Sequence, residues 1–167
     1  MIETRKSPTP ADLRQFRAAM ANVVSPVSVV TTLDTSRPMG TTVSAFASLS
    51  LHPPMVMVSL DRQSELLSRL AVGSRLGLNV LGAHQEQIAR RFASKIPDRY
   101  ADTSWQIEDG APRIQGAHSF VSLDVSDMVP AGDHVIVLGT VSSASGDSRA
   151  GAPLSYYRQK YGTHHPI

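Results

Sequence analysis

Residues 40–54 read GTTVSAFASLSLHPP, and residues 55–60 continue as MVMVSL. A run of small, hydroxyl-bearing residues therefore leads through two prolines into an apolar strand that ends on Ser59 and Leu60. Small side chains let a planar or phosphorylated ligand approach the backbone closely, and the strand supplies a rigid floor. The stretch predicts a cofactor site, although threonine is also a good strand former and the same hydroxyls fit an ordinary strand and turn.

A second informative segment lies far along the chain, where residues 132–139 read GDHVIVLG. The glycine and aspartate indicate a turn, and the residues after His134 have the β-branched character of a strand. His134 at this position fits two interpretations. It is either a turn residue or a reactive side chain held at the start of a strand.

Composition restricts the classes of protein to be considered. The chain has 167 residues, of which 41% are hydrophobic and 18% charged, and these values fit one globular domain. The formal net charge is +2 and the basic residues are scattered, so the basic stripe of a nucleic-acid-binding protein is missing. The absence of cysteine excludes disulfides, thiolate metal sites and cysteine nucleophiles.

The ends of the chain give a weaker indication of location. Residues 1–8 read as a flexible N-terminal arm without an apolar signal core, followed by a single domain over 9–167. No segment approaches the roughly 20 apolar residues of a membrane-spanning helix. We therefore expect a cytoplasmic protein.

The periodicity of the chain predicts mostly strands. We expect strands over 27–33, 39–45, 55–60, 75–81, 117–128 and 134–145, and helices over 10–20, 64–70 and 84–93. The continuous apolar run at 55–60 predicts a strand buried on both faces. Residues 94–116 are expected to be mostly irregular, and 154–161 form an aromatic-rich tail. A mainly β domain with this many antiparallel neighbours removes its exposed edges most economically as a closed or partly closed barrel.

Common catalytic motifs are missing from the chain. We find no G-x-G-x-x-G after a strand, no Walker A loop, no G-x-S-x-G and no H-E-x-x-H. Ser59 and Ser64 flank a strand-to-helix turn, where helix-terminal amides can hold a phosphate, although Ser64 fits a simple capping role equally well. The hydroxyl run thus remains the strongest candidate for a site.

The order and spacing of eight segments resemble the flavin reductase family, which has the FMN-binding split β-barrel fold with a few flanking helices. Members of this family are the reductase components of two-component flavin-dependent monooxygenases. The segments that carry the resemblance are residues 16–20, 26–32, 40–46, 50–54, 78–81, 85–92, 132–134 and 153–161. The chain departs from the family at Ser25-Pro26-Val27, where the family often has glycine.

The resemblance implies a role for several residues. The isoalloxazine ring of the flavin would lie along Thr42, Val43, Ser44 and Ala45, and the ribityl phosphate toward Ser59, Leu60 and Ser64. Arg91 and Phe92 match a stretch that approaches the distal part of the flavin. His134 matches the histidine near the reactive face of the flavin, and Tyr157, Arg158 and Tyr161 match a tail that helps to close the site.

The resemblance also explains why the catalytic motifs are missing. Hydride transfer from NADH or NADPH to FMN or FAD needs two stacked rings at contact distance and no protein nucleophile. The implied function is an NAD(P)H-dependent flavin reductase, a homodimer that supplies reduced flavin to a partner monooxygenase. A non-catalytic flavin-binding protein of the same fold remains the alternative. A pyridoxine-phosphate type of oxidase is less well supported, since it would need a larger basic phosphate cluster. The sequence does not separate FMN from FAD or NADH from NADPH.

Overall fold

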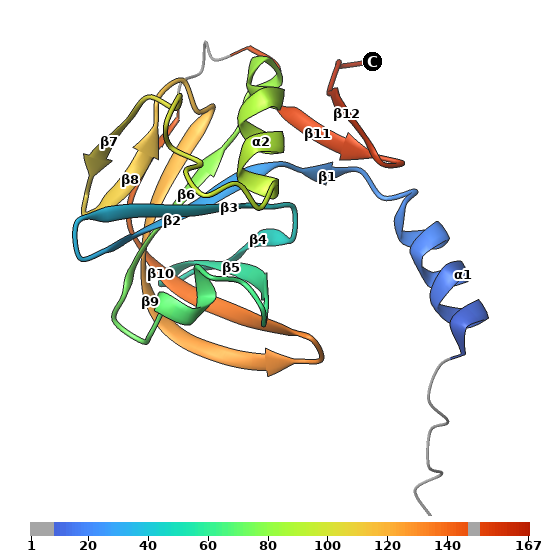
Figure 1. Ribbon diagram of the computed structural model, residues 1–167, viewed down its shortest axis with the longest axis horizontal. Helices are drawn as coiled ribbons and strands as arrows, with labels where there is room; N and C mark the ends of the chain where they lie inside the picture. Colours follow the sequence, from blue (N-terminus) through green and yellow to red (C-terminus); the bar gives the residue numbers. More distant parts are fainter. Residues whose placement is uncertain (1–8, 147–150) are drawn as a thin grey trace, which may run out of the picture.

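The computed structural model describes residues 9–146 and 151–167 (Figure 1). The predicted N-terminal arm over residues 1–8 lies outside the described residues. Within the described ranges no helix is long and apolar enough to cross a membrane.

A seven-stranded antiparallel sheet forms the body of the protein (Figure 1). Its strands follow the order β3-β2-β6-β9-β10-β5-β4. Their bounds are β2 (Ser28–Asp34), β3 (Arg37–Val43), β4 (Phe46–Leu51), β5 (Pro54–Asp61), β6 (Arg75–Val80), β9 (Ser119–Ala131) and β10 (His134–Gly146).

The connection between β3 and β4 forces this sheet to curve back on itself. The two strands lie at opposite ends of the hydrogen-bonded order, yet only Ser44 and Ala45 separate them in the chain. The amide of Ser59 in β5 also donates to the carbonyl of Ala45 at 2.8 Å, which fastens the crossing to the other side of the sheet. The three Cα–Cα steps from the end of β3 to the start of β4 span at most about 11 Å, so the edges must approach each other. The mainly β, split-barrel fold predicted from the sequence is confirmed.

The hydrophobic core has two parts. The larger part lies within the curved sheet and includes Val58, Leu76 and Leu123, all fully buried. The smaller part lies beneath helix α2 (Glu86–Ala93) and includes the fully buried Phe92 and Ile114. The two parts pack on opposite faces of β2, because Val30 belongs to the larger part and Val29 to the smaller part.

The expectation that residues 55–60 are buried on both faces is wrong. Val56, Val58 and Leu60 are buried, whereas Met55, Met57 and Ser59 are only partly covered. In the curved antiparallel sheet one face of β5 points into the core and the other does not, so burial alternates along the strand. The half-exposed face leaves Ser59 accessible.

Three helical predictions are met to different degrees. Helix α1 (Pro10–Met20) has the predicted bounds, and the structure shows a capping box between Thr9 and Asp12 at its start. The predicted helix over 84–93 is a short 3-10 turn, η2 (Ala83–Gln85), that continues into α2. The predicted helix over 64–70 is reduced to the 3-10 turn η1 (Leu67–Arg69).

The segment 94–116 is more regular than predicted. It contains a hairpin of β7 (Trp105–Glu108) and β8 (Ala111–Ile114), turned by Asp109 and Gly110 with φ of 44° and 77°. An Asp-Gly pair is a typical hairpin signal, which Pro112 in the second strand obscures. The aromatic tail likewise forms strands, β11 (Leu154–Tyr157) and β12 (Lys160–Thr163). They pair with each other, and β11 also pairs with β1 (Ser25–Pro26), which makes a three-stranded sheet. The strand β4 was also not predicted.

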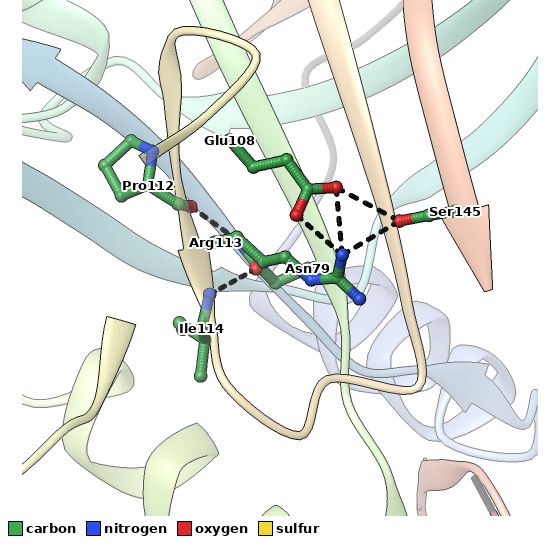
Figure 2. A network of polar contacts seen from close by, with 6 residues as sticks. All are labelled: Asn79, Glu108, Pro112, Arg113, Ile114 and Ser145. Carbon is green, nitrogen blue, oxygen red and sulfur yellow. Dashed lines mark hydrogen bonds and ion pairs between the residues drawn. The ribbon is translucent and has the colours of Figure 1, made fainter. Parts of the chain in front are cut away.

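A buried asparagine connects the β7–β8 hairpin to the main sheet (Figure 2). Asn79 in β6 is fully buried, and its side-chain amide donates to the carbonyls of Val29 and Pro112 at 3.2 Å each. Its carbonyl oxygen accepts from the amide of Ile114 at 2.8 Å. The same view shows a second, more accessible contact, in which Ser145 accepts from the Arg113 guanidinium at 3.1 Å.

Replacing Asn79 should destabilise the protein because it leaves buried backbone groups of the hairpin without partners. We expect Asn79→Ala to lower the free energy of unfolding by about 2–4 kcal/mol. Ser145→Ala is the matched control, since the Arg113–Glu108 ion pair persists without the serine. The control should lose no more than about 1 kcal/mol. Urea unfolding monitored by Trp105 fluorescence measures both, and equal losses would contradict the central role of Asn79.

Candidate functional site

A cavity of about 210 Å³ lies where β3, β5 and β10 meet, and we call it the site cavity. It is bordered by the end of β3, the Ser44–Ala45 crossing, the end of β5 and the turn that follows it. Its lining residues are Thr41, Thr42, Val43, Ser44, Ala45, Ser59, Leu60, Asp61, Ser64 and His134. The hydroxyl run thus lies in the same place as residues from two distant parts of the chain.

Strand pairing brings His134 to this cavity. In the β5–β10 ladder His134 lies opposite Asp61, Val135 opposite Leu60 and Ile136 opposite Ser59. The amide of Arg62 also donates to the carbonyl of Asp133 at 3.0 Å, which joins the turn after β5 to the turn before β10. The position of His134 is therefore set by backbone hydrogen bonds on a rigid part of the sheet.

Two hydroxyl groups of the predicted site are already used by the protein. The Thr42 hydroxyl donates to the carbonyl of Ala89 in α2 at 2.7 Å, which fastens β3 to the helix. The Ser64 hydroxyl accepts from the amide of Leu67 at 3.4 Å, a local contact in the turn after β5. The N-cap residue of η1 is Leu66, without a side-chain cap, so Ser64 does not cap a helix, and it lines the site cavity.

The crossing itself is the most accessible part of the wall. Ser44 and Ala45 are both exposed, and their small side chains leave the backbone open to a ligand. Behind them, Val43 is buried and its carbonyl accepts from the Ser28 hydroxyl at 2.9 Å. This arrangement is a firmly held edge with small side chains on the open side, which fits a flat ring lying against the backbone.

His134 is oriented by the residue before it. Its Nδ1 lies 2.8 Å from Oδ1 of Asp133, and this hydrogen bond holds the pKa of the Asp133 carboxyl below its usual range. An ionised carboxylate only accepts hydrogen bonds, so the contact places a proton on Nδ1 of His134. When the imidazole is neutral, its Nε2 is then left as an acceptor, on a side chain that is 42% exposed.

Five residues implied by the family resemblance do not line the site cavity within one chain. Arg91 pairs with Asp102 at 2.7 Å, and Phe92 is fully buried against the back of β3. A Cβ atom added at Gly40 would lie 2.7 Å from the Phe92 ring, which shows how closely the two pack. Phe92 thus supports β3, the strand that carries Thr42 and leads into Ser44, and a direct contact with a ligand stays a prediction.

The predicted tail residues form a separate cluster. Arg158 donates to Oδ1 of Asn22 at 2.9 and 2.7 Å, and the Tyr161 ring lies 4.8 Å from the Arg90 guanidinium. Tyr157, Arg158 and Tyr161 all line a different cavity next to the C-terminus. Their contribution to closing the site remains a prediction.

Sequence reasoning missed two residues of the site cavity. Thr41 and Asp61 line it but were not among the predicted binding residues. Asp61 accepts from the amide of Gln63 at 2.7 Å and so shapes the turn after β5. The signal was present, because an aspartate that ends an apolar strand often forms such a turn.

Comparisons with known proteins identify the family of the chain. Residues 20–165 match the flavin reductase like domain. The chain is 38% identical over 157 residues to an NADH:riboflavin 5'-phosphate oxidoreductase of Streptomyces pristinaespiralis, covering 92% of this chain and 89% of that protein.

Solved structures give the same assignment. Nitrilotriacetate monooxygenase component B from Mycobacterium thermoresistibile superposes with a TM-score of 0.89 at 32% identity, covering 93% of this chain and 88% of the other. The NADH:FAD oxidoreductase of Streptomyces globisporus, solved with NAD and FAD fragments, gives a TM-score of 0.87 at 28% identity, covering 96% and 98%. The chain belongs to the flavin reductase family and is an NAD(P)H-dependent flavin reductase with the split-barrel fold.

Proposed function

We propose that this chain binds FMN or FAD in the site cavity, reduces it with NADH or NADPH, and passes the reduced flavin to a partner monooxygenase. The observation that carries the proposal is the meeting of the hydroxyl run, the turn after β5 and His134 around one cavity. The wall offers backbone, small hydroxyls, one histidine and the carboxylate of Asp61, and its backbone and small hydroxyls suit the positioning of two rings.

The residues of the site divide the work as follows. The nicotinamide and the flavin supply the hydride chemistry, and the protein supplies their positions. Thr42, Val43, Ser44 and Ala45 bind the ring through backbone atoms, and Ser59, Leu60 and Ser64 lie toward the phosphate. His134 borders the reactive face, where its Nε2 can bind the nicotinamide amide. Backbone donors aimed at the developing negative charge of the reduced ring stabilise the product.

We infer that the active form is a homodimer. The site cavity, at about 210 Å³, is smaller than the roughly 300–1,000 Å³ of most ligand pockets, so one chain forms only part of an enclosure. No residue of α1 is buried, and its apolar Phe16 and Met20 are 63% and 50% exposed. Figure 1 shows this helix projecting away from the sheet. A second copy that covers α1 would account for both features. The expected cytoplasmic location stays a prediction.

An anaerobic assay tests the proposed function. Purified protein, FMN or FAD, and NADH or NADPH are mixed, and the absorbance of the reduced nicotinamide is followed. We expect oxidation of the nicotinamide that depends on flavin. If flavin binds and neither nicotinamide reduces it, the non-catalytic alternative is correct. If no flavin binds, both interpretations fail.

Replacing His134 should affect reduction more than flavin binding, because the side chain borders the reactive face. We expect His134→Ala to lower kcat/KM for the nicotinamide by about ten- to hundredfold, with a flavin Kd changed by less than about threefold. His84→Ala is the matched control, because His84 is exposed and lies outside the site cavity. A parallel loss of flavin affinity and rate in His134→Ala would make His134 a structural residue instead.

Enlarging Ser44 should block the close approach of the ring to the backbone. We expect Ser44→Leu to weaken flavin binding by about tenfold or more, measured by quenching of flavin fluorescence. Ser48→Leu is the control, because Ser48 is also exposed but lies in β4 outside the site cavity. Unchanged flavin affinity in Ser44→Leu would place the ring elsewhere.

A further inference from the structure

Helix α1 stands away from the sheet and is held to the body of the protein at one end (Figure 1). None of its residues is buried. Among the residues that the structure describes, the hydrogen bonds that join residues 10–22 to the body involve Ala21 and Asn22, directly after the helix. The direction of α1 is therefore set where the helix ends.

Arg158 makes these hydrogen bonds, and we call them the clasp. Its guanidinium donates from Nε and Nη2 to Oδ1 of Asn22 at 2.9 and 2.7 Å, and its amide donates to the carbonyl of Ala21 at 3.1 Å. The side-chain amide of Asn22 in turn donates to the carbonyl of Ala18, in the last turn of the helix, at 3.2 Å. The clasp thus satisfies carbonyls at the helix end and places a positive charge where the helix dipole favours it.

The residue that makes the clasp has an unfavourable backbone conformation. Arg158 and Gln159 form the two-residue turn between β11 and β12, where Tyr157 lies opposite Lys160. Their φ angles are 45° and 64°, in the left-handed region. Such turns favour Asn-Gly or Gly-Gly, because glycine adopts a positive φ without a steric cost. Glycine at position 158 would relieve the strain and lose the guanidinium, so the strained arginine indicates a role for its side chain.

The direction of α1 decides where an apolar stripe lies. The stripe consists of Leu13, Phe16 and Met20, which share one face of the helix and are all exposed. A helix of 11 residues is about 16 Å long, so a rotation of about 30° at the clasp moves its far end by about 8 Å. The position of the stripe therefore depends on the clasp.

A second copy of this chain suits the stripe as a partner. Leu49 and Leu51 in β4 are also exposed, so the chain itself has apolar surface that can cover the stripe of another copy. In a two-fold dimer each copy gives and receives the same contact. Strand β4 follows directly on the Ser44–Ala45 crossing, so a second copy bound there lies beside the site cavity.

We propose that Arg158 is a positioning residue, which holds α1 at the angle at which its stripe packs on a second copy. This role rests on the homodimer proposed above. It differs from the closing of the site that the family resemblance implies for Arg158. The side chain acts through Asn22 and the end of α1, and it needs no contact with the flavin or the nicotinamide.

Spin labels measure the direction of α1, and the absence of cysteine in the chain allows labelling at chosen positions. Gln15→Cys on α1 and Gln106→Cys on β7 carry the labels, because both side chains are exposed and Gln15 lies on the opposite face from the stripe. Labelled chain is diluted into unlabelled chain, so that the distances recorded lie within one copy. We expect a narrow distance distribution with the clasp intact and a broad one in Arg158→Gly and in Asn22→Ala.

The strained turn supplies a matched control. Gln159→Gly relieves the same turn and leaves the clasp intact, so its label distances and dimer dissociation constant should match the wild type. Sedimentation over a range of concentrations gives that constant, and we expect it to rise about tenfold in Arg158→Gly and in Asn22→Ala. The double variant should be no weaker than either single variant, because the two residues share one contact.

Asn22→Ala also separates positioning from ligand binding. The proposal is overturned if Arg158→Gly raises KM for the nicotinamide while Asn22→Ala leaves KM and the label distances at their wild-type values. Unchanged label distances in both variants overturn it as well. A wild type that stays monomeric at every concentration overturns the proposed homodimer and with it the role of the clasp. Flavin-dependent oxidation of the nicotinamide by that monomer would leave the proposed reductase activity standing.

Discussion

The crossing at Ser44 and Ala45 is the constraint on which the rest of the structure depends. It joins strands at the two ends of a seven-stranded order with only two residues, so the sheet has to curve until its edges approach. The hydrogen bond from the Ser59 amide to the Ala45 carbonyl fastens this curve. The same crossing gives the site cavity its open, small-residue wall. Fold closure and ligand access are thus consequences of one short piece of backbone.

This constraint explains why the hydroxyl run fits two interpretations. Thr42 holds β3 against α2, and Ser64 accepts from the Leu67 amide in the turn after β5, so both make structural contacts. Both nevertheless line the site cavity, because the elements that they fasten are the ones that form its walls. Ser44 differs from them because it is exposed. Its small side chain leaves open space in front of the backbone. A residue that stabilises a wall and a residue that faces the ligand have similar sequence signals.

The sequence predicted the elements with strong local patterns and missed those that depend on tertiary contacts. The contacts between Thr9 and Asp12 are local in sequence, and helix α1 spans the residues predicted for it, 10–20. Strand β4 has alternating small residues without a strong apolar pattern, and it forms because β5 pairs with it. The β7–β8 hairpin depends on Asn79, which is 33 residues from Pro112 in the sequence. A prediction from neighbouring residues cannot identify such a distant hydrogen-bond partner. His134 was singled out by its place after Gly132 and Asp133, and the family resemblance implied its role. Only the register of β5 against β10 explains how it reaches the cavity.

The distribution of charge supports a division of the arginines into two groups. Arg75, Arg91 and Arg113 each pair with a carboxylate: Arg75 connects β6 to the hairpin turn, Arg91 connects α2 to Asp102, and Arg113 joins the two strands of the hairpin. Surface pairs of this kind contribute little to stability individually, but they decide where positive charge is neutralised. Arg99 has backbone carbonyls as partners, which orient its guanidinium without cancelling its charge. Glu65 and Asp98 line the same cavity as Arg37 and Arg99, so the positive and negative side chains there are equal in number.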